Sequence, residues 1–339
     1  MAKYHIPGMA VQLVVKDKAY EYYFGVANRE SKEPISSKTI FEIGSLSKVM
    51  TALLIAQEID WAKMTLSDPI NKYIKELPES FSEMTLQQLA THTSGLPFDL
   101  SDDMTTKEDA MTYLTHWKAE YDPAEKWIYS NVGIGLLGYA LENINEKPYD
   151  KVYLRHIMIP LGMVNGVEVP KSLQKYYAQG YNQQDLPVPP IHSKAFPSAG
   201  VIKASALDMQ KFLKAAVGVE GTPARVLYPM RLTQSIFLKG GNDFQGLGWD
   251  IHPFTKNKTS ALINNISDTH HFGPSKIYEI YERPSYDGDA LIDKTGATKG
   301  FRTYIAVIPN RKIGIVIQAN KNIPDSAIVK PAREILLGL

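Results

Sequence analysis

Ser45 and Lys48 are the residues whose types and spacing most directly indicate chemistry. They stand three positions apart at the start of an apolar stretch, residues 49–56. If this stretch is helical, side chains at that spacing share a face and can touch. A serine hydroxyl is a weak nucleophile at neutral pH, and an amine that takes its proton can activate it. The pattern Ser-x-x-Lys also arises by chance, and Ser45 could simply cap a helix.

Two later triplets contain residues that could complete such a site. Residues 129–131 read Tyr-Ser-Asn, and residues 294–296 read Lys-Thr-Gly. The order Ser-x-x-Lys, then hydroxyl-x-Asn, then Lys-Thr-Gly is typical of penicillin-recognising serine enzymes. On these motifs the chain resembles the serine β-lactamase and penicillin-binding protein superfamily. Within it, the chain is most similar to class C β-lactamases, whose middle motif is Tyr-x-Asn.

The resemblance extends along nearly the whole chain. Residues 6–11, 41–44, 246–249 and 319–322 also look like segments of the family. Residues 92–97, His-Thr-Ser-Gly-Leu-Pro, are closer to the broader group of serine D,D-peptidases and esterases. We therefore expect the family's acylation machinery to be intact and the rim that binds substrate to differ from that of class C enzymes.

The resemblance implies a role for each of four side chains. Ser45 is the expected nucleophile, and Lys48 is either its proton acceptor or an electrostatic aid to another acceptor. Tyr129 is the second candidate base. Because a tyrosine ordinarily titrates near 10, it needs flanking cations, and Lys48 and Lys294 are the expected pair. A packed aromatic residue is the structural alternative for Tyr129.

The third motif is expected to bind the substrate. The resemblance implies that the backbone N–H groups of Ser45 and Ala297 form the oxyanion hole. Lys294 and Thr295 would contact the substrate carboxylate. Gly296, which has no side chain, would let the substrate lie along the strand edge.

Other expected substrate contacts lie around the rim of the site. Asn131 would orient Lys48 and the side-chain amide of the substrate. Some rim residues differ from the class C pattern: Asp99 replaces a glutamine, Ala199 a tyrosine and Lys299 a glycine, while Ile328 takes the place of an arginine. We expect a wider pocket at Ala199 and compensation by Lys299 for the missing arginine. The expected rim contacts are Asn131, Asp99, Ala199, Lys299 and Asn322.

Composition narrows the class of partner. The chain has 339 residues, with 37 basic and 36 acidic side chains and no long run of one sign. This balance gives no electrostatic case for nucleic acid. The balance favours a small-molecule substrate, and the family resemblance implies that this substrate is a β-lactam. We also predict a monomeric protein.

Metal and cofactor chemistry find little support in the sequence. The chain contains no cysteine, which excludes thiolate catalysis and cysteine-ligated zinc. His270 and His271 are adjacent, so their side chains point in different directions, and we expect both to be surface residues. The chain is expected to use no metal and no cofactor.

The sequence also bears on the compartment. Residues 1–7 lack the apolar core of a signal peptide, and no apolar run is long enough to span a bilayer. We expect no membrane insertion. Because a β-lactamase usually meets its substrate outside the cytoplasm, the resemblance implies a periplasmic enzyme whose export signal is not part of this chain.

The elements that must position these residues are expected to form an α/β (α+β) fold. Residues 9–15 with 20–26, and 304–309 with 313–318, read as hairpins. Helices are expected over 85–91, 132–143, 205–217 and 326–337. These patterns predict the β-lactamase/D,D-peptidase-like arrangement, an antiparallel sheet built from both termini and flanked by helices.

The domain organisation follows from the same patterns. Residues 1–60 and 200–339 are expected to form the sheet domain, and residues 61–199 a mostly helical domain, with the active site in the cleft between them. Residues 187–191 and 256–282 are expected to be irregular connections.

Several functions remain open at this point. The leading hypothesis is β-lactam hydrolysis through an acyl-Ser45 intermediate. A D,D-carboxypeptidase or penicillin-binding protein shares the acylation step and differs in deacylation. An esterase of the same fold and a non-catalytic binding module are the further alternatives.

Overall fold

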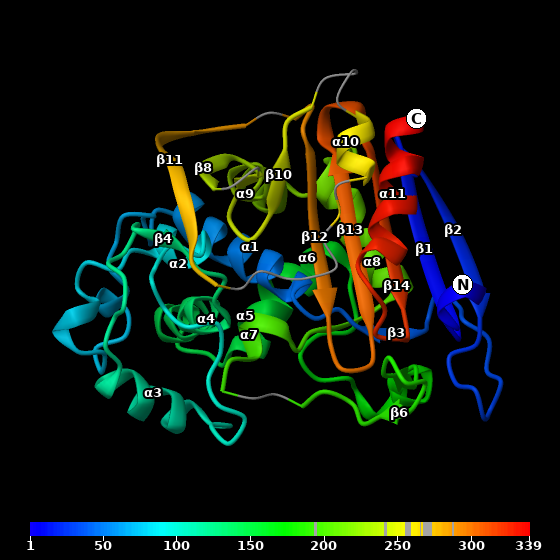
Figure 1. Cartoon of the computed structure of the whole chain (residues 1–339), viewed down its shortest axis with the longest axis horizontal. Coiled ribbons are helices and arrows are strands. Elements are labelled where there is room, and N and C mark those ends of the chain that lie inside the picture. The colour runs from blue at the N-terminus through cyan, green and yellow to red at the C-terminus, as the bar shows by residue number, and fades with distance from the viewer. Residues whose placement is uncertain (193–194, 241–242, 255–258, 265, 267–272, 287) are drawn as a thin grey trace.

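A ten-stranded antiparallel sheet forms one side of the molecule (Figure 1). The computed structural model describes residues 1–192, 195–240, 243–254, 259–264, 266, 273–286 and 288–339. In spatial order the strands are β2 (Lys18–Gly25), β1 (Gly8–Val15), β14 (Ile313–Ala319), β13 (Arg302–Ile308), β12 (Leu291–Ala297), β10 (Asp250–His252), β9 (Asp243–Gln245), β8 (Ile236–Gly240), β11 (Ser275–Ser285) and β4 (Lys126–Trp127). Two-stranded sheets pair β3 (Ile40–Glu42) with β7 (Lys203–Ser205) and β5 (Gly180–Tyr181) with β6 (Pro187–Val188).

The helices lie on both faces of the sheet and in the region beside it (Figure 1). They are α1 (Leu46–Asp60), α2 (Leu86–Ala90), α3 (Lys107–His116), α4 (Asn131–Asn145), α5 (Tyr149–Tyr153), α6 (Ile159–Leu161), α7 (Pro197–Gly200), α8 (Ala206–Val217), α9 (Ala224–Thr233), α10 (Thr259–Asn264) and α11 (Ser326–Gly338). A π-helical segment, Leu154–Met158, joins α5 to α6. Short 3₁₀ segments occur at Ala2–Tyr4, Ile70–Lys72, Glu79–Phe81, Lys171–Tyr176 and Pro309–Arg311.

Both ends of the chain build the sheet, as predicted. Strand β1 pairs with β2 on one side and with β14 on the other. Side chains alternate across a strand, so neighbouring residues of β14 enter different cores. Val316 belongs to the core under α8 and α1, whereas Ile315 and Ile317 belong to the core under α11. The expected α/β fold is confirmed.

The predicted helices are present. Helix α2 begins after a capping box formed by Thr85 and Gln88, and α8 begins after one formed by Ser205 and Asp208. In each box the two residues satisfy one another's backbone N–H groups, which fixes the helix start. Helix α11 continues through Pro331 and buries its apolar face against the sheet.

The expectation of an irregular connection over 256–282 was wrong in part. Residues 259–264 form α10, and β11 begins at Ser275 and pairs with β8 and β4. Most side chains of β11 are exposed, and its pairing with β8 contains register shifts. Because few of its residues are buried, the strand lacks the clear apolar alternation on which the sequence prediction depends. His270 and His271 lie outside the described residues.

Candidate active site

The start of helix α1 brings Ser45 and Lys48 together. Ser45 immediately precedes the helix, and the Nζ of Lys48 lies 3.1 Å from the Ser45 Oγ. Within the described part of the chain, the Ser45 side chain caps no backbone N–H of α1, so the simple capping alternative is not what the structure contains. Lys48 is only 1% exposed. Its burial, opposed by the nearby Tyr129 and reinforced by the Lys294 charge, lowers its pKa from the ordinary lysine value.

Helix α7 fixes the Lys48 side chain from the other side. The Nζ of Lys48 donates to the backbone carbonyl oxygen of Ala199 over 2.6 Å, and Thr51 one turn later donates to the carbonyl of Ser198 over 2.7 Å. Helix α4 lets α7 approach, because Gly138 faces Ser198 and a Cβ on that glycine would lie 2.6 Å from the Ser198 Cβ. A glycine in one helix therefore sets the position of the carbonyl group that holds Lys48.

Tyr129 lies between two ammonium groups. The Nζ atoms of Lys48 and Lys294 lie 5.1 and 5.0 Å from the centroid of its ring. Burial alone would raise the pKa of Tyr129. The charges of Lys294 and Lys48, together with a hydrogen bond to Ser45, outweigh burial, and the pKa falls below its ordinary value. The buried His92 ring packs against Tyr129 with the ring centroids 4.3 Å apart. The sequence analysis noted His92 only as part of the segment 92–97 and assigned it no role in the site.

Lys294 stays charged in this environment. Its burial would lower its pKa, but Asp250, whose carboxylate oxygen lies 3.4 Å from the Lys294 Nζ, raises the pKa above the ordinary lysine value, with a further contribution from Tyr129. The two lysines therefore differ in electrostatic character: the pKa of Lys48 is lowered and that of Lys294 is raised. Strand β12 holds Lys294, Thr295 and Gly296 in pairing with β13.

The backbone of β12 passes close to the residues before Ser45. Gly44 has a φ of 54°, in the left-handed region, and a Cβ on it would lie 2.6 Å from the Ala297 nitrogen. A Cβ on Gly296 would collide with the carbonyl oxygen of Ile43. Both positions therefore require glycine. This approach brings the backbone of Ala297 beside Ser45, which is the pairing expected for an oxyanion hole.

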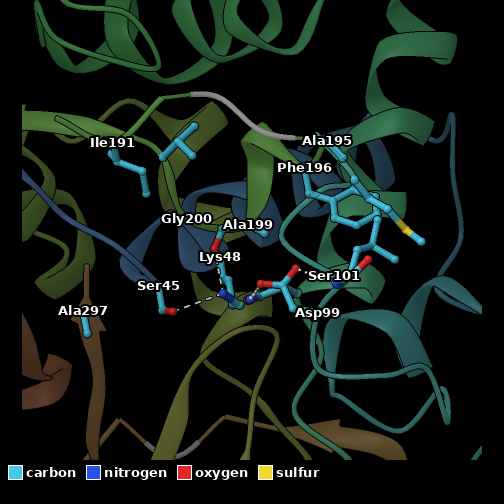
Figure 2. A pocket seen from close by; sticks show the side chains of 14 residues that line it. Ser45, Lys48, Asp99, Ser101, Ile191, Ala195, Phe196, Ala199, Gly200 and Ala297 are labelled. Carbon is cyan, nitrogen blue, oxygen red and sulfur yellow. Dashed lines mark hydrogen bonds between the residues drawn. The ribbon is translucent and has the colours of Figure 1, made fainter. Parts of the chain in front are cut away.

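Two cavities meet at Ser45. The first has a volume of about 160 Å³ and is lined by Ser45, Lys48, Asn131, Asp99, Ala199 and Ala297, together with mostly apolar side chains (Figure 2). The second, of about 290 Å³, is lined by Ser45, Tyr129, Asn131, Lys294, Thr295 and Ala297, together with Phe98, Trp127, Asp250 and Arg302. The structure thus gathers the residues of all three motifs around one hydroxyl group.

Arg302 is a site residue that the sequence analysis missed. It lies opposite Ala297 in the pairing of β12 with β13 and lines the second cavity with Lys294. Its guanidinium donates to Asp325 and to the side chain of Asn322, each over 2.8 Å. The expected rim residue Asn322 is thus linked to the second cavity by its hydrogen bond with Arg302. Lys299 lies in the turn between these two strands and is exposed.

Asn131 and Asp99 contact each other. The Nδ2 of Asn131 donates to the Asp99 Oδ2 over 2.8 Å, and the Asn131 backbone N–H donates to the carbonyl of Phe98 over 2.7 Å. The Lys48 Nζ donates to the Ser45 Oγ and to the Ala199 carbonyl oxygen, and the expected role of Asn131 in orienting Lys48 stays a prediction. Ala199 contributes its carbonyl oxygen to this arrangement, in addition to lining the cavity.

Comparison with known proteins identifies the family. A family model described as Beta-lactamase matches residues 1–339. The chain belongs to the beta-lactamase family. It is 32% identical over 343 residues to a β-lactamase of Pseudomonas fluorescens, an alignment that covers 99% of this chain and 94% of that protein.

Solved structures agree with this membership of the beta-lactamase family. A structure described as a β-lactamase/D-alanine carboxypeptidase from Pseudomonas syringae matches with a TM-score of 0.92 and 31% identity, covering 99% of this chain and 95% of that one. A class C β-lactamase in complex with cefoxitin also has a TM-score of 0.92, with 30% identity and coverage of 100% and 95%. The predicted similarity to class C enzymes is confirmed.

The described residues also bear on metal binding and on membrane insertion. In the described ranges, no group of three or more His, Asp or Glu side chains is arranged to hold a metal ion. Over the same ranges, none of the helices combines the length and the apolar character needed to cross a membrane.

Proposed function

We propose that this protein is a serine β-lactamase that hydrolyses the β-lactam amide through an acyl-Ser45 intermediate. The observation that carries the proposal is the contact of the Lys48 ammonium group with the Ser45 Oγ, beside a Tyr129 ring flanked by two cations. Membership of the beta-lactamase family supports the same reaction.

Acylation begins when the Ser45 Oγ attacks the lactam carbonyl carbon and gives its proton to Tyr129. The lowered pKa of Tyr129 favours the phenolate that this step needs. Lys48 donates a hydrogen bond to the Oγ and keeps it in place. The backbone N–H groups of Ser45 and Ala297 stabilise the oxyanion. When the carbon–nitrogen bond breaks, Tyr129 returns the proton to the departing nitrogen.

Deacylation uses the same groups in reverse. Tyr129 takes a proton from a water molecule, whose oxygen attacks the acyl-Ser45 carbonyl carbon. The ester bond then breaks, Tyr129 returns the proton to the Ser45 Oγ, and the acid product leaves. Because Lys48 and Lys294 flank the ring in both halves of the cycle, one tyrosine can serve both steps.

The second cavity receives the carboxylate of the substrate in this proposal. Lys294, Thr295 and Arg302 line it and supply the positive charge and the hydroxyl group that an anion needs. Gly296 leaves the edge of β12 open beside the substrate amide. The contribution of the exposed Lys299 to the same carboxylate stays a prediction.

A D,D-carboxypeptidase activity is the second candidate. One specific observation favours it, since the similar structure from Pseudomonas syringae is described by both activities. Both candidates require acyl transfer to Ser45, and they differ in how quickly water removes the acyl group. The rate of deacylation therefore decides between them.

A stopped-flow time course with a chromogenic cephalosporin tests the proposal. We expect sustained turnover by the native chain and none by Ser45→Ala. Ser47→Ala is the matched control, because the Ser47 hydroxyl bonds the backbone of Gly44 and Ile202 rather than the cavity. A colour change equivalent to one substrate molecule per enzyme, with no further turnover, would identify a penicillin-binding protein. No colour change at all would contradict both candidates.

We further propose that the enzyme is a monomer that acts in the periplasm. The proposal is supported by the family's chemistry, because the substrate is met outside the cytoplasm. Fractionation of cells that express the full-length gene product tests the compartment, and light scattering of the purified protein tests the monomer. Activity confined to the cytoplasmic fraction, or the mass of a dimer, would contradict the respective part.

A further inference from the structure

The first of the two cavities beside Ser45, with a volume of about 160 Å³, has an exposed charged side chain in its wall. Among the described residues that line it, only Lys48 and Asp99 are charged. Lys48 is buried, and its ammonium group already donates to Ser45 and Ala199. Asp99 is exposed, and Figure 2 shows its carboxylate on the cavity wall across from Ser45. A substrate group that enters this cavity therefore meets a negative charge at its rim.

The Asp99 carboxylate is held in place by its neighbours. The Nδ2 of Asn131 donates to the Asp99 Oδ2 over 2.8 Å, and the backbone N–H of Leu100 donates to the Oδ1 over 3.0 Å. Asn131 is the first residue of α4, and its own N–H anchors the carbonyl of Phe98. A carboxylate accepts about four hydrogen bonds, so these two leave room for a ligand donor.

The rest of the cavity wall is largely apolar. Leu100, Met104, Ile191 and Phe196 line it, and such side chains favour the aromatic or aliphatic body of an acyl substituent. The wall thus combines an apolar surface with one fixed carboxylate. An acyl substituent with the complementary pattern has an apolar ring and a single ammonium group.

We propose that this cavity selects β-lactams whose acyl substituent carries a protonated amine next to the amide, and disfavours those that carry an anion there, with Asp99 as the specificity-determining residue. The inference rests on the proposed function, since it assigns the substrate class of the same site. Complementary charge favours the matching substrate, and like charge opposes the other.

Three penicillins provide a matched series for the test. Ampicillin, benzylpenicillin and carbenicillin share the bicyclic core and the phenyl ring, and they carry an ammonium group, a hydrogen and a carboxylate, respectively, on one side-chain carbon. At about pH 6.5 an α-amino group is mostly protonated. The native chain and Asp99→Asn are compared by kcat/KM on all three. Asparagine keeps the shape of Asp99 and an oxygen that can accept from Asn131.

The ratios of kcat/KM isolate the effect of charge. On going from the native chain to Asp99→Asn, we expect the ratio of ampicillin to benzylpenicillin to fall about fivefold, and the ratio of carbenicillin to benzylpenicillin to rise about fivefold. Asp103→Asn is the matched control, because it removes the same charge from the same loop at a residue outside the lining of this cavity. Its ratios should stay at the native values.

The other outcomes separate the inference from the proposed function. Hydrolysis of all three penicillins with ratios unmoved by Asp99→Asn would overturn the inference alone. A uniform loss over the three substrates would also overturn it, because Asp99 would then act only by positioning Asn131. Equal changes of these ratios in Asp99→Asn and Asp103→Asn would show that only the total negative charge of the loop matters. That result would overturn the specific role of Asp99. No hydrolysis of any penicillin by the native chain would contradict the proposed function itself.

Discussion

The Nζ of Lys48 donates to the backbone carbonyl oxygen of Ala199 over 2.6 Å, so the lysine nearest the proposed nucleophile is oriented by main chain from a distant segment. The carbonyl group is carried by α7, and α7 rests on α4. No side-chain substitution removes this acceptor. The geometry at Ser45 therefore depends on how α7 packs against α4.

Gly138→Ala should disturb this packing. The new Cβ would lie 2.6 Å from the Ser198 Cβ, so α7 must move and carry the Ala199 carbonyl with it. Displacing a reacting group by about 1 Å can cost roughly a hundredfold in rate, and we expect kcat to fall at least tenfold. Overpacking should also lower the free energy of unfolding by about 1–3 kcal/mol. Turnover assays and urea denaturation measure the two effects.

The double variant Gly138→Ala/Ser198→Gly is the control for that prediction. It removes the Cβ that the new methyl group would meet, so α7 can return toward its place. We expect kcat to recover more than the free energy of unfolding, because a second glycine also weakens the short helix. Equal loss of kcat in the single and double variants would contradict a mechanism through α7.

The pH dependence of kcat/KM should report the ionisation of Tyr129. Its pKa lies below the ordinary tyrosine value of about 10 because the charges of Lys294 and Lys48 outweigh burial. Activity that needs the phenolate rises with pH through this pKa. Lys294→Gln removes one of the two cations and should move the rising limb to higher pH, whereas Lys294→Arg keeps the charge and should leave it near the native position. An unmoved limb in Lys294→Gln would exclude Tyr129 as the base.

The contrast between Lys294 and Arg302 explains which site residues the sequence could predict. Ser45, Tyr129 and Lys294 stand in short motifs with fixed spacing, so each could be assigned from its immediate neighbours. Arg302 enters the site because the register of β12 and β13 places it opposite Ala297. Register depends on the assembled sheet. The hairpins and the capped helices also carry local sequence signals, so they were predictable. Strand β11 buries few side chains and lacks such a signal, so it was not predicted.

Arg302 should contribute more to binding of the substrate carboxylate than Lys299 does. Arg302 is 7% exposed and lines the cavity beside Lys294, whereas Lys299 is exposed and its charge is screened by water. Removing Arg302 alone would also break its buried ion pair with Asp325, so the test uses Arg302→Gln/Asp325→Asn, which changes both partners. We expect KM for a penicillin to rise roughly tenfold in this variant.

Lys299→Gly is the comparison for Arg302→Gln/Asp325→Asn. We expect its KM to change by less than about twofold, because an exposed charge contributes little. Thermal denaturation of each variant checks that the fold is kept. A larger rise in KM for Lys299→Gly than for the double variant would assign the carboxylate to Lys299, as the sequence comparison first implied.

The buried cluster behind Lys294 should govern stability at low pH. Asp293 accepts hydrogen bonds from Tyr304 and from Arg333, the latter over 2.7 Å, and lies 3.1 Å from His252. Burial would raise the pKa of Asp293, but Arg333 and His252 outweigh burial and lower it.

Asp293→Asn should therefore lower the free energy of unfolding at neutral pH by about 3–5 kcal/mol, because it leaves the Arg333 charge buried and uncompensated. Since folding depresses the pKa of Asp293, its stabilisation is complete above the unfolded value of about 3.9 and is lost as the pH falls toward the folded value. Urea denaturation at neutral pH and near pH 3 should thus show a smaller loss on acidification in Asp293→Asn than in the native chain. Asp17→Asn, in the exposed turn between β1 and β2, is the control and should follow the native chain. An equal loss on acidification in Asp293→Asn and the native chain would show that the cluster does not control acid stability.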